Sequence, residues 1–511
     1  MNPSLFKNRS FVSTWIGNGI SELGGAFGTF CNSILIYQLT GSTLALGSMW
    51  LLYFIPSLIL QLFIGPYIDR WSRKWIMILS QWTRGAIFVI PLAALVSGNL
   101  EVWHIYVVQC VVGLITPFYV PANHAITPTI VEKEQLQSAN AIIDGTVRLM
   151  TFLSPIVAGI VIEYIGVHIT LILVSSMLIM SGFTLLFIQE KRSNIKVRKT
   201  WLADFTEGIS FFFSHKIIVW LGIFLAFVQF GVGVTMVTTL PYITEELGGT
   251  YAEYGYFMAG FPIGYIVGAI IVTRIKYKSR RLLMLGSLFI GGITFIALCF
   301  NYSILIAITT ETIGGIGMAI FSIHNTTIIQ KTVPNHLIGK VFSVRLLIIR
   351  GVMPLGVLIG GVLSELLGVR PLYLFIGLLI SITSLAGLCL PYFKFIEIPV
   401  KDIQKSIAWY TEVLGLELIW NSEEEKLAQL NLPSGQMIFL NETIEDTTAN
   451  FLKNGEVHNV IGFQTSNINH VYNHLINNAV QVEEIVDDGL GNNFLHFYDL
   501  DGNKFCVQYD K

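Results

Sequence analysis

The sequence predicts an all-α polytopic membrane protein with twelve transmembrane helices in two six-helix halves, followed by a smaller α+β domain. Only 13% of the 511 residues are charged and 53% are apolar, whereas a typical soluble protein is about 25% charged. Residues 1–394 contain 25 Lys and Arg against 15 Asp and Glu, whereas residues 395–511 contain 6 against 18. The net charge of −2 therefore conceals +10 and −12, which indicates two domains, 1–394 and 395–511, in different surroundings.

A transmembrane helix needs about 20 mostly apolar residues. Such stretches lie before residue 395 at 10–38, 44–67, 75–97, 102–122, 140–164, 168–189, 217–242, 252–274, 282–300, 303–328, 341–365 and 370–392. Twelve spans place both termini on one side of the membrane. Lys and Arg gather in one set of loops, and the opposite set holds only Arg370. Because basic loops stay in the cytoplasm, we expect a cell-membrane protein with both termini and the acidic domain inside the cell.

The first domain contains an internal repeat. A shift of 202 residues aligns glycine and polar positions of spans four and five with those of spans ten and eleven, pairing Gly113 with Gly315, Asn123 with Asn325, Arg148 with Arg350, Gly159 with Gly361, Glu163 with Glu365 and Gly166 with Gly368. Apolar segments match by chance, but paired charges in one register do not. Two parallel six-span halves are a transporter architecture with a site at their interface. The basic segment 191–216 is expected to be the long loop between the halves.

The loop after span two reads G-x-x-x-D-R-x-x-R-K, with its key positions at Gly65, Asp69, Arg70, Arg73 and Lys74. This pattern resembles the corresponding loop of the major facilitator superfamily, and the resemblance covers residues 1–394. It implies a secondary transporter in which this loop is a breakable latch for one conformation. An anchor that only follows the positive-inside rule is the alternative.

Span five contains Gly145, Pro155 and Gly159 in a pattern similar to the superfamily's antiporter motif. Either a coupling role or plain helix packing by small residues explains it. The segments 8–11, 37–42 and 122–131 resemble the macrolide-efflux branch, which often has an acid where this sequence has Gly25. Glu22 lies on the same helical face and is the candidate substitute.

Charged residues occur inside the predicted spans, at Glu22, Arg84, Asp144, Arg148, Glu311, Arg345 and Arg350. Charges at this depth are costly, so each is expected to face the interior and to be paired. Asp144 and Arg148 are spaced i, i+4 and are expected to form an ion pair. Glu22 is the leading candidate for proton coupling, followed by Asp144 and Glu311. A purely structural polar lock is the alternative, chiefly for Asp144 and Arg148.

The last 117 residues repeat with a period of 65, so that 395–403 aligns with 460–468. Each copy reads as a strand followed by a helix capped by Asp402 or Asn467. A D-x-D-G-N turn follows at 499–503. This pattern resembles the glyoxalase, bleomycin-resistance and dioxygenase superfamily (vicinal oxygen chelate), which implies a pair of βαβββ units.

The resemblance places the metal-ligand positions of this superfamily at Phe395, Phe439, Val460 and Cys506. Three of these side chains bind no metal, so we expect neither a metal nor another cofactor, and no catalytic activity. His458 is expected to share a strand face with Val460 and to be a surface or packing residue. The candidate ligand-binding residues of a drier cavity are Trp409, Trp420 and His496. The five cysteines form neither a C-x-x-C pair nor a disulfide framework.

The predicted function is secondary active transport, with proton-coupled efflux of an amphiphilic, macrolide-like drug and a metal-free cytoplasmic ligand-binding module. The expected partners are a small amphiphile, protons and the lipid membrane, with no nucleic acid, and dimerisation through the last domain is an open possibility. Two alternatives remain: a transporter fused to an enzyme that modifies its substrate, and an uptake carrier with a sensory domain.

Overall fold

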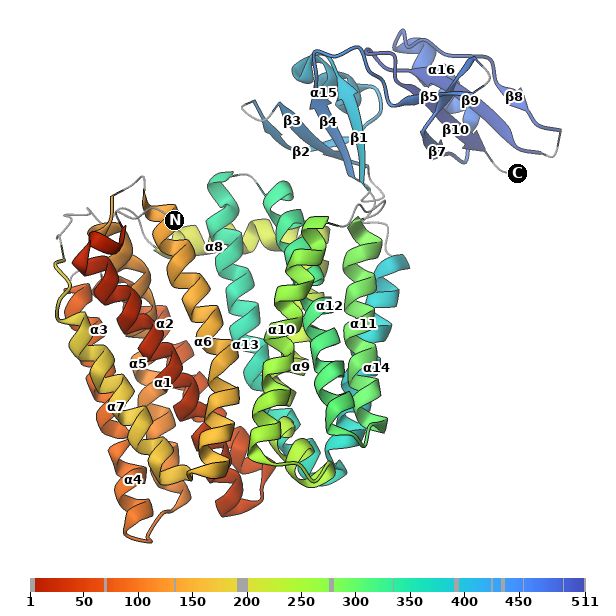
Figure 1. Cartoon of the computed structure of the whole chain (residues 1–511). Coiled ribbons are helices and arrows are strands. Elements are labelled where there is room, and N and C mark those ends of the chain that lie inside the picture. Colours follow the sequence, from red (N-terminus) through yellow and green to blue (C-terminus); the bar gives the residue numbers. More distant parts are fainter. Residues whose placement is uncertain are drawn as a thin grey trace. The chain divides into compact units, whose positions relative to one another are not determined.

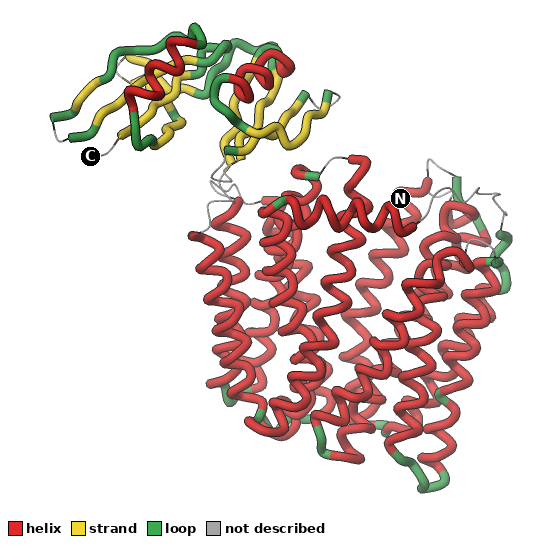
Figure 2. The backbone as a smooth tube through the Cα atoms, turned by 180° about the vertical axis from the view of Figure 1, so that it is seen from behind, coloured by secondary structure: helices red, strands yellow, loops and turns green. Residues whose placement is uncertain are grey.

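The computed structural model describes residues 5–68, 71–132, 135–190, 201–274, 280–333, 335–389, 395–423, 426–432, 437–453, 455–489 and 491–509. The chain divides into two compact units, of which the second consists mainly of Leu388–Lys511. The first unit is helical, and the second combines strands with two helices (Figure 2). Each unit is described by itself.

The first half of the helical unit contains α1 (Arg9–Thr40), α2 (Thr43–Ile68), α3 (Arg73–Ile87), α4 (Val89–Val96), α5 (Val102–Ile130), α6 (Leu136–Tyr164) and α7 (Val167–Leu185). The second half contains α9 (Lys216–Pro241), a π-helical turn η3 (Tyr242–Glu246), α10 (Tyr251–Arg274), α11 (Arg280–Phe300), α12 (Ile304–Thr332), α13 (Asn335–Leu367) and α14 (Val369–Cys389). These helices run between two ends of the unit (Figure 1). We call the end where α1 begins proximal and the end where α1 finishes distal.

Eleven helices of the described chain are long and apolar enough to cross a membrane. The stretch predicted as the first span forms α1, which has 32 residues but lies outside this set. Its Asn, Ser, Thr and Gly residues lower its hydropathy. The polytopic helical fold is confirmed, and the number of exactly twelve spans stays a prediction.

The span expected at 75–97 is found as Arg73–Val96, one of the eleven helices that can cross a membrane. Its helical hydrogen bonding is interrupted at Phe88, between α3 and α4, because Pro91 lacks the N–H that would bond the carbonyl oxygen of Ile87. Another predicted segment differs from the structure. The segment 191–216, expected to be a loop, contains α8 (Trp201–Ser214). This helix runs across the proximal end (Figure 1), and it is too short to be recognised as a span.

The two halves share a buried apolar cluster. Phe30 and Leu46 contribute from the first half, and Tyr254 and Val357 contribute from the second. The Phe30 and Tyr254 rings stack with centroids 4.7 Å apart. Glycines allow the helix crossings: a Cβ on Gly113 would lie 2.4 Å from the Tyr53 carbonyl oxygen, and one on Gly315 would lie 2.2 Å from that of Phe261. The repeat seen in the sequence thus corresponds to equivalent helix contacts in both halves.

The second unit contains two copies of one βαβββ arrangement. The first copy comprises β1 (Phe395–Val400), α15 (Ile403–Glu412), β2 (Glu417–Ser422), β3 (Leu427–Asn431) and β4 (Met437–Glu442), in the sheet order β1-β4-β3-β2. The second comprises β7 (Ile461–Gln464), α16 (Ile468–Asn477), β8 (Val486–Asp487), β9 (Asn493–Tyr498) and β10 (Lys504–Tyr509), in the order β7-β10-β9-β8. A hairpin of β5 (Asn450–Lys453) and β6 (Glu456–Asn459) separates them. The paired βαβββ units are confirmed.

The predicted caps and turn position these copies. The side chains of Asp402 and Asn467 accept hydrogen bonds from backbone N–H groups in the first turns of α15 and α16. In the D-x-D-G-N turn, the Asp499 carboxylate accepts hydrogen bonds from the Tyr410 hydroxyl at 2.6 Å and from the Asn503 side-chain amide at 2.7 Å. The Asn503 amide also donates to the Pro399 carbonyl oxygen. The turn therefore joins the second copy to the first.

Candidate functional site

A buried polar cluster lies where α1, α3 and α5 meet in the first half. The Tyr119 hydroxyl donates to Asn18 Oδ1 at 2.9 Å, and the Gln81 side-chain amide donates to the Ser21 hydroxyl at 2.6 Å. These four side chains are at most 4% exposed. Buried polar groups in apolar surroundings stay stable only when they are hydrogen-bonded, so this network fixes the three helices relative to one another.

Glu22 lies beside this cluster. It follows Ser21 on α1, is half-buried, and interacts electrostatically with Arg84 of α3. A Cβ at Gly25 would be 2.6 Å from a terminal nitrogen of Arg84, so the guanidinium occupies the space of the missing side chain. Both Glu22 and Arg84 are described, and no ion pair or direct hydrogen bond joins them. The bare position at Gly25 thus lets Arg84 lie against α1, one turn from Glu22.

Two donors of the cluster are buried without a hydrogen-bond partner within the described chain, Asn18 Nδ2 and Arg84 Nε. Arg84 also makes one long contact, 3.5 Å, with Gln81 Oε1. An unsatisfied buried donor costs about 1–3 kcal/mol. The arrangement can therefore offer hydrogen bonds to a carboxylate or another acceptor that comes within reach.

Glu311 lies apart from this cluster, in the second half. It is half-buried on α12, its Cβ lies 3.4 Å from the position of a Cβ on Gly260 of α10, and it interacts electrostatically with Tyr373 of α14. Tyr373 in turn contacts the Thr238 hydroxyl at 3.3 Å. The two candidate proton carriers, Glu22 and Glu311, therefore lie in different halves and have different neighbours.

The predicted Asp144–Arg148 ion pair is wrong for this structure. Both side chains are exposed, and within the described chain neither takes part in an ion pair. An exposed pair gains little Coulomb energy against the entropy of fixing two side chains. Residues 144, 148, 155 and 159 recur at helical spacing and share one face of α6. At 155 and 159 this face contacts α10 of the second half.

The two arginines of α13 have hydrogen-bond partners. Arg350 of α13 donates a hydrogen bond to Gln61 Oε1 of α2, which crosses between the halves. Arg345 donates to the Thr326 hydroxyl at 2.9 Å and lies over the Phe342 ring. Their partners are neutral oxygen atoms and a ring face rather than carboxylates.

The antiporter-like positions divide into two groups. A Cβ on Gly159 would lie 2.5 Å from the Tyr251 carbonyl oxygen of α10, and one on Gly255 would lie 2.3 Å from that of Pro155. A Cβ on Gly145 would meet nothing within 4 Å. Gly159 and Pro155 therefore belong to a close helix crossing between the halves, whereas Gly145 does not.

The loop after α2 is described in part, because Asp69 and Arg70 lie outside the described residues and Gly65 is described only as part of α2. The amides of Arg73 and Lys74 donate to the Glu190 carboxylate at 3.1 and 3.3 Å, and the Lys74 ammonium group donates to the Leu186 carbonyl oxygen at 2.7 Å. The start of α3 is thus held by the segment after α7, within its own half.

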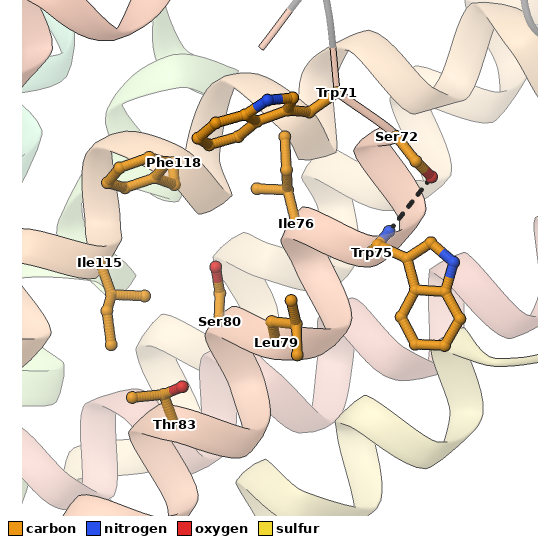
Figure 3. Close-up of a pocket in the computed structure, with 9 residues that line it drawn as sticks. All are labelled: Trp71, Ser72, Trp75, Ile76, Leu79, Ser80, Thr83, Ile115 and Phe118. Carbon is orange, nitrogen blue, oxygen red and sulfur yellow. Dashed lines mark hydrogen bonds between the residues drawn. The ribbon is translucent and has the colours of Figure 1, made fainter. Parts of the chain in front are cut away.

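A groove of about 330 Å³ runs along the outer face of α3 and α5 near this loop (Figure 3). Trp71, Trp75 and Leu79 line it and are each at least half exposed. Thr83 lines its inner end, one residue before Arg84. Neither Arg84 nor Gln81 lines the groove, so it is separate from the polar cluster.

In the second unit, His496 belongs to a charged cluster on β9 and β10. The Glu483 carboxylate accepts hydrogen bonds from Lys504 at 2.7 Å and from the Tyr498 hydroxyl at 2.6 Å, and lies 3.5 Å from His496 Nδ1. Partial burial would raise the pKa of Glu483, but the hydrogen bonds from Lys504 and Tyr498 outweigh it and lower that pKa. Burial, and then the charge of Lys504, lower the pKa of His496. The imidazole is therefore neutral at pH 7.

Trp420 and Trp409 lie on opposite faces of the first sheet. The Trp420 indole donates to Gln429 Oε1 at 3.1 Å, and the Gln429 amide donates to Asn431 Oδ1 at 3.0 Å. Trp409 is on α15 and packs against the core on the other side, which includes Ala428 and Leu430. Only Trp420 of this pair lies beside a row of polar side chains.

The four positions that the superfamily uses for metal ligands hold Phe395, Phe439, Val460 and Cys506. Phe439 and Cys506 are each 8% exposed, and burial raises the pKa of the Cys506 thiol. The expectation that His458 and Val460 share a strand is wrong, because β6 ends at Asn459 and β7 begins at Ile461. His458 instead stacks on Phe451. In the described chain no group of three His, Cys, Asp or Glu is placed to hold a metal ion.

Family models match both units. The transmembrane secretion effector family matches residues 3–420, and the glyoxalase/bleomycin resistance protein/dioxygenase superfamily matches residues 392–507. The chain belongs to the transmembrane secretion effectors of the major facilitator superfamily. Its last part is a glyoxalase-type domain, so this transporter joins the two folds in one polypeptide.

Relatives of this transporter include named efflux proteins. Macrolide efflux protein A of Streptococcus pyogenes is 24% identical over 386 residues, which cover 72% of this chain and 93% of that protein. The multidrug efflux pump Tap of Mycolicibacterium fortuitum is 23% identical over 400 residues, or 75% of this chain and 95% of that protein. Among solved structures, the nucleoside transporter NupG has a TM-score of 0.60 at 14% identity, covering 76% of this chain and 99% of NupG. This last similarity shows the fold alone.

Sequence reasoning missed several residues of this transporter's polar network. Asn18, Gln81 and Tyr119 complete the cluster beside Glu22, and Glu190 holds the start of α3. Amide side chains inside apolar spans are a usable signal for Asn18 and Gln81. Tyr119 carried no such signal, because tyrosine also packs as an apolar residue.

Proposed function

We propose that this transporter exports an amphiphilic compound in exchange for protons, and that Glu22 carries the proton. The observation that supports the proposal is the placement of Glu22, half-buried beside a hydrogen-bonded polar cluster and within electrostatic range of Arg84. A carboxylate in these surroundings has two stable forms, ionised and balanced by the guanidinium, or protonated and neutral.

The two forms give α1 and α3 two arrangements. When Glu22 is ionised, attraction draws Arg84 toward it along α1. When Glu22 is protonated, the attraction ends and Arg84 rests over Gly25, the position it occupies in this structure. Proton binding is thereby linked to the packing of two helices that belong to the same half.

Export and the substrate class are supported by the names of relatives. Proteins that align with most of this chain are called macrolide and multidrug efflux proteins, and macrolides are large amphiphiles. The excess of Lys and Arg at the proximal loops favours a cytoplasmic proximal end, with both termini and the glyoxalase-type domain inside the cell. The cell membrane is the proposed location.

The test uses full-length protein in proteoliposomes with an imposed pH gradient. Uptake of a labelled macrolide into vesicles of inverted orientation, abolished by a protonophore, is the expected result. Accumulation in the opposite direction would favour the uptake carrier, and transport unaffected by the protonophore would contradict proton coupling. Glu22→Gln should abolish this uptake. Glu101→Gln is the matched control, because Glu101 is exposed at the start of α5, where its carboxylate accepts a hydrogen bond from the Trp103 indole.

We propose further that the glyoxalase-type domain binds the transported compound without a metal and without catalysis. Apolar Phe439 and Val460 at two ligand positions, and the row formed by Trp420, Gln429 and Asn431, support a cavity that combines an aromatic face with amide groups. Cys506 pairs with His496 in the register of β10 and β9. The raised pKa of its thiol disfavours the enzyme alternative.

Binding to the full chain tests this role. Trp420→Ala should weaken binding of the exported compound about tenfold, in the range of a buried aromatic contact. Trp409→Phe is the control, since Trp409 packs on the opposite face of the same sheet. Equal affinity in both variants would contradict binding at this face, and conversion of the compound by wild-type protein would support the enzyme alternative. Dimerisation through this domain is a separate proposal, tested by the mass of the complex in solution.

A further inference from the structure

The repeated carboxylates Glu163 and Glu365 have equivalent roles at the distal end. Glu163 lies in the last turn of α6 and accepts a hydrogen bond from the backbone N–H of Tyr251, the first residue of α10, at 3.0 Å. Glu365 lies in the last turn of α13 and accepts one from the backbone N–H of Leu44, near the start of α2, also at 3.0 Å. Each carboxylate therefore caps a helix of the other half.

The backbone N–H groups in the first turn of both capped helices have acceptors of the same two kinds, one local and one from the other half. In α10 the Thr250 hydroxyl accepts the Glu253 N–H, and in α2 the Ser42 hydroxyl accepts the Ala45 N–H. These local caps leave other amides of the first turn without a partner in their own half. The carboxylate from the opposite half satisfies one of them, and its charge also interacts favourably with the positive end of the helix dipole.

Close helix crossings lie directly beneath the two caps. Gly159 and Gly361 precede Glu163 and Glu365 by one turn, and their Cβ positions approach backbone atoms of Tyr251 and Thr43, at 2.5 and 3.2 Å. One further turn past each carboxylate, Gly166 and Gly368 have φ angles of +105° and +84°. The sequence G-x-x-x-E-x-x-G thus builds one device twice: a crossing, a cap and a helix end.

We infer that Glu163 and Glu365 are the paired gate residues that hold the distal end closed and must release α10 and α2 whenever that end opens. The caps exist only while α6 meets α10 and α13 meets α2. A major facilitator transporter has to separate these contacts to expose its site on the distal side. The Ser42 hydroxyl, which donates to Glu365 at 2.9 Å, strengthens one of the two caps.

The inference rests on the family assignment and on the contacts, not on the substrate or on proton coupling. Its failure is therefore distinguishable from failure of the proposed function. Proton-coupled export does not require that Glu163 and Glu365 control the distal end. Conversely, a transporter with this gate can work by uptake.

The test measures the distance between the halves at the distal end in the full chain. Spin labels are placed at Val96→Cys on α4 and Leu305→Cys on α12, both more than 70% exposed, in a background in which the native cysteines are replaced. The Glu163→Ala/Glu365→Ala variant should raise the population of the distally open state about tenfold relative to the closed state, because each helix cap contributes roughly twofold to thirtyfold. Glu163→Gln/Glu365→Gln should give a smaller shift, since it keeps an acceptor oxygen without the charge.

Glu253→Ala is the matched control. Glu253 lies at the same end and in the first turn of α10, but its carboxylate accepts from Thr250 of its own half. Its loss affects open and closed states alike, so no shift is expected. An unchanged distance distribution in both double variants, or an equal shift in Glu253→Ala, would overturn the inference. If the alanine variant fails to fold, the glutamine variant decides the question by itself.

Discussion

The two halves of the helical unit share a frame but differ in the chemistry inside it. Gly113 and Gly315 make equivalent close crossings, and Glu163 and Glu365 make equivalent caps. In the same register, however, Tyr119 of the first half corresponds to Phe321 of the second. A hydroxyl that completes a polar network on one side is thus absent from the other. The helix contacts are therefore pseudosymmetric, whereas the polar cluster beside Glu22 belongs to the first half alone.

The largest expected effect comes from breaking the shared frame. Gly113→Ala and Gly315→Ala each place a methyl group within 2.5 Å of a backbone carbonyl oxygen, so each should destabilise the protein by about 3 kcal/mol. Thermal unfolding of purified protein measures the loss. Gly145→Ala is the control, because a Cβ there meets nothing within 4 Å. If the control lost as much stability as the other two, the crossings would not be the cause.

A smaller effect is expected from the paired arginines. Arg350 is hydrogen-bonded to Gln61 across the halves, whereas Arg148, its counterpart in the repeat, is exposed. Arg350→Ala should therefore cost about 2 kcal/mol, as expected for a hydrogen bond to a charged group, and Arg148→Ala should cost less than about 0.5 kcal/mol. Denaturant titration in detergent compares the two. Equal losses would mean that the asymmetry seen here has no energetic weight.

The predicted fold corresponds to the observed one wherever period and composition dominate. Apolar length located the helices, and the 202-residue and 65-residue repeats located both pairs of structural units. The pairing of charges was harder to predict: Asp144 and Arg148 have ideal spacing for an ion pair, yet they lie exposed and apart. The spacing of residues along one helix does not show which neighbouring helix packs against that face. The partners of Glu22 came from α3 and α5, which tertiary packing alone brings together.

Exchanging the ring at position 119 tests the difference between the two halves. Tyr119→Phe makes the first half resemble the second and leaves Asn18 Oδ1 without its donor, so it should cost about 1 kcal/mol. Phe321→Tyr is the reciprocal change, and it adds a hydroxyl at a fully buried position. Unfolding and transport are measured for both variants. Transport that survives Tyr119→Phe unchanged would indicate that the network supports structure without taking part in coupling.

The smallest expected effect concerns the acid stability of the glyoxalase-type domain. The folded-state pKa of Glu483 is lowered, so its contribution to stability is complete above the unfolded-state pKa and is lost as the pH falls through the folded-state value. Burial raises the folded-state pKa of Asp499. Its contribution to stability therefore has the opposite pH dependence: it is present at low pH and is lost as the pH rises. Because Glu483 is 41% exposed, Glu483→Gln should cost less than about 1 kcal/mol at pH 7. Hydrogen exchange in β9 and β10 of the full chain, followed from pH 7 to pH 4, should show a shallower acid loss in this variant.

Proton movement driven by the transported compound tests whether the proton site lies in the first half. Vesicles containing wild-type, Glu22→Gln or Glu311→Gln protein, loaded with a pH-sensitive dye, report the protons that move when a macrolide is added. If coupling resides in the first half, Glu22→Gln abolishes the signal and Glu311→Gln retains it. Unchanged coupling in Glu22→Gln, or loss confined to Glu311→Gln, would contradict a proton site built from α1, α3 and α5.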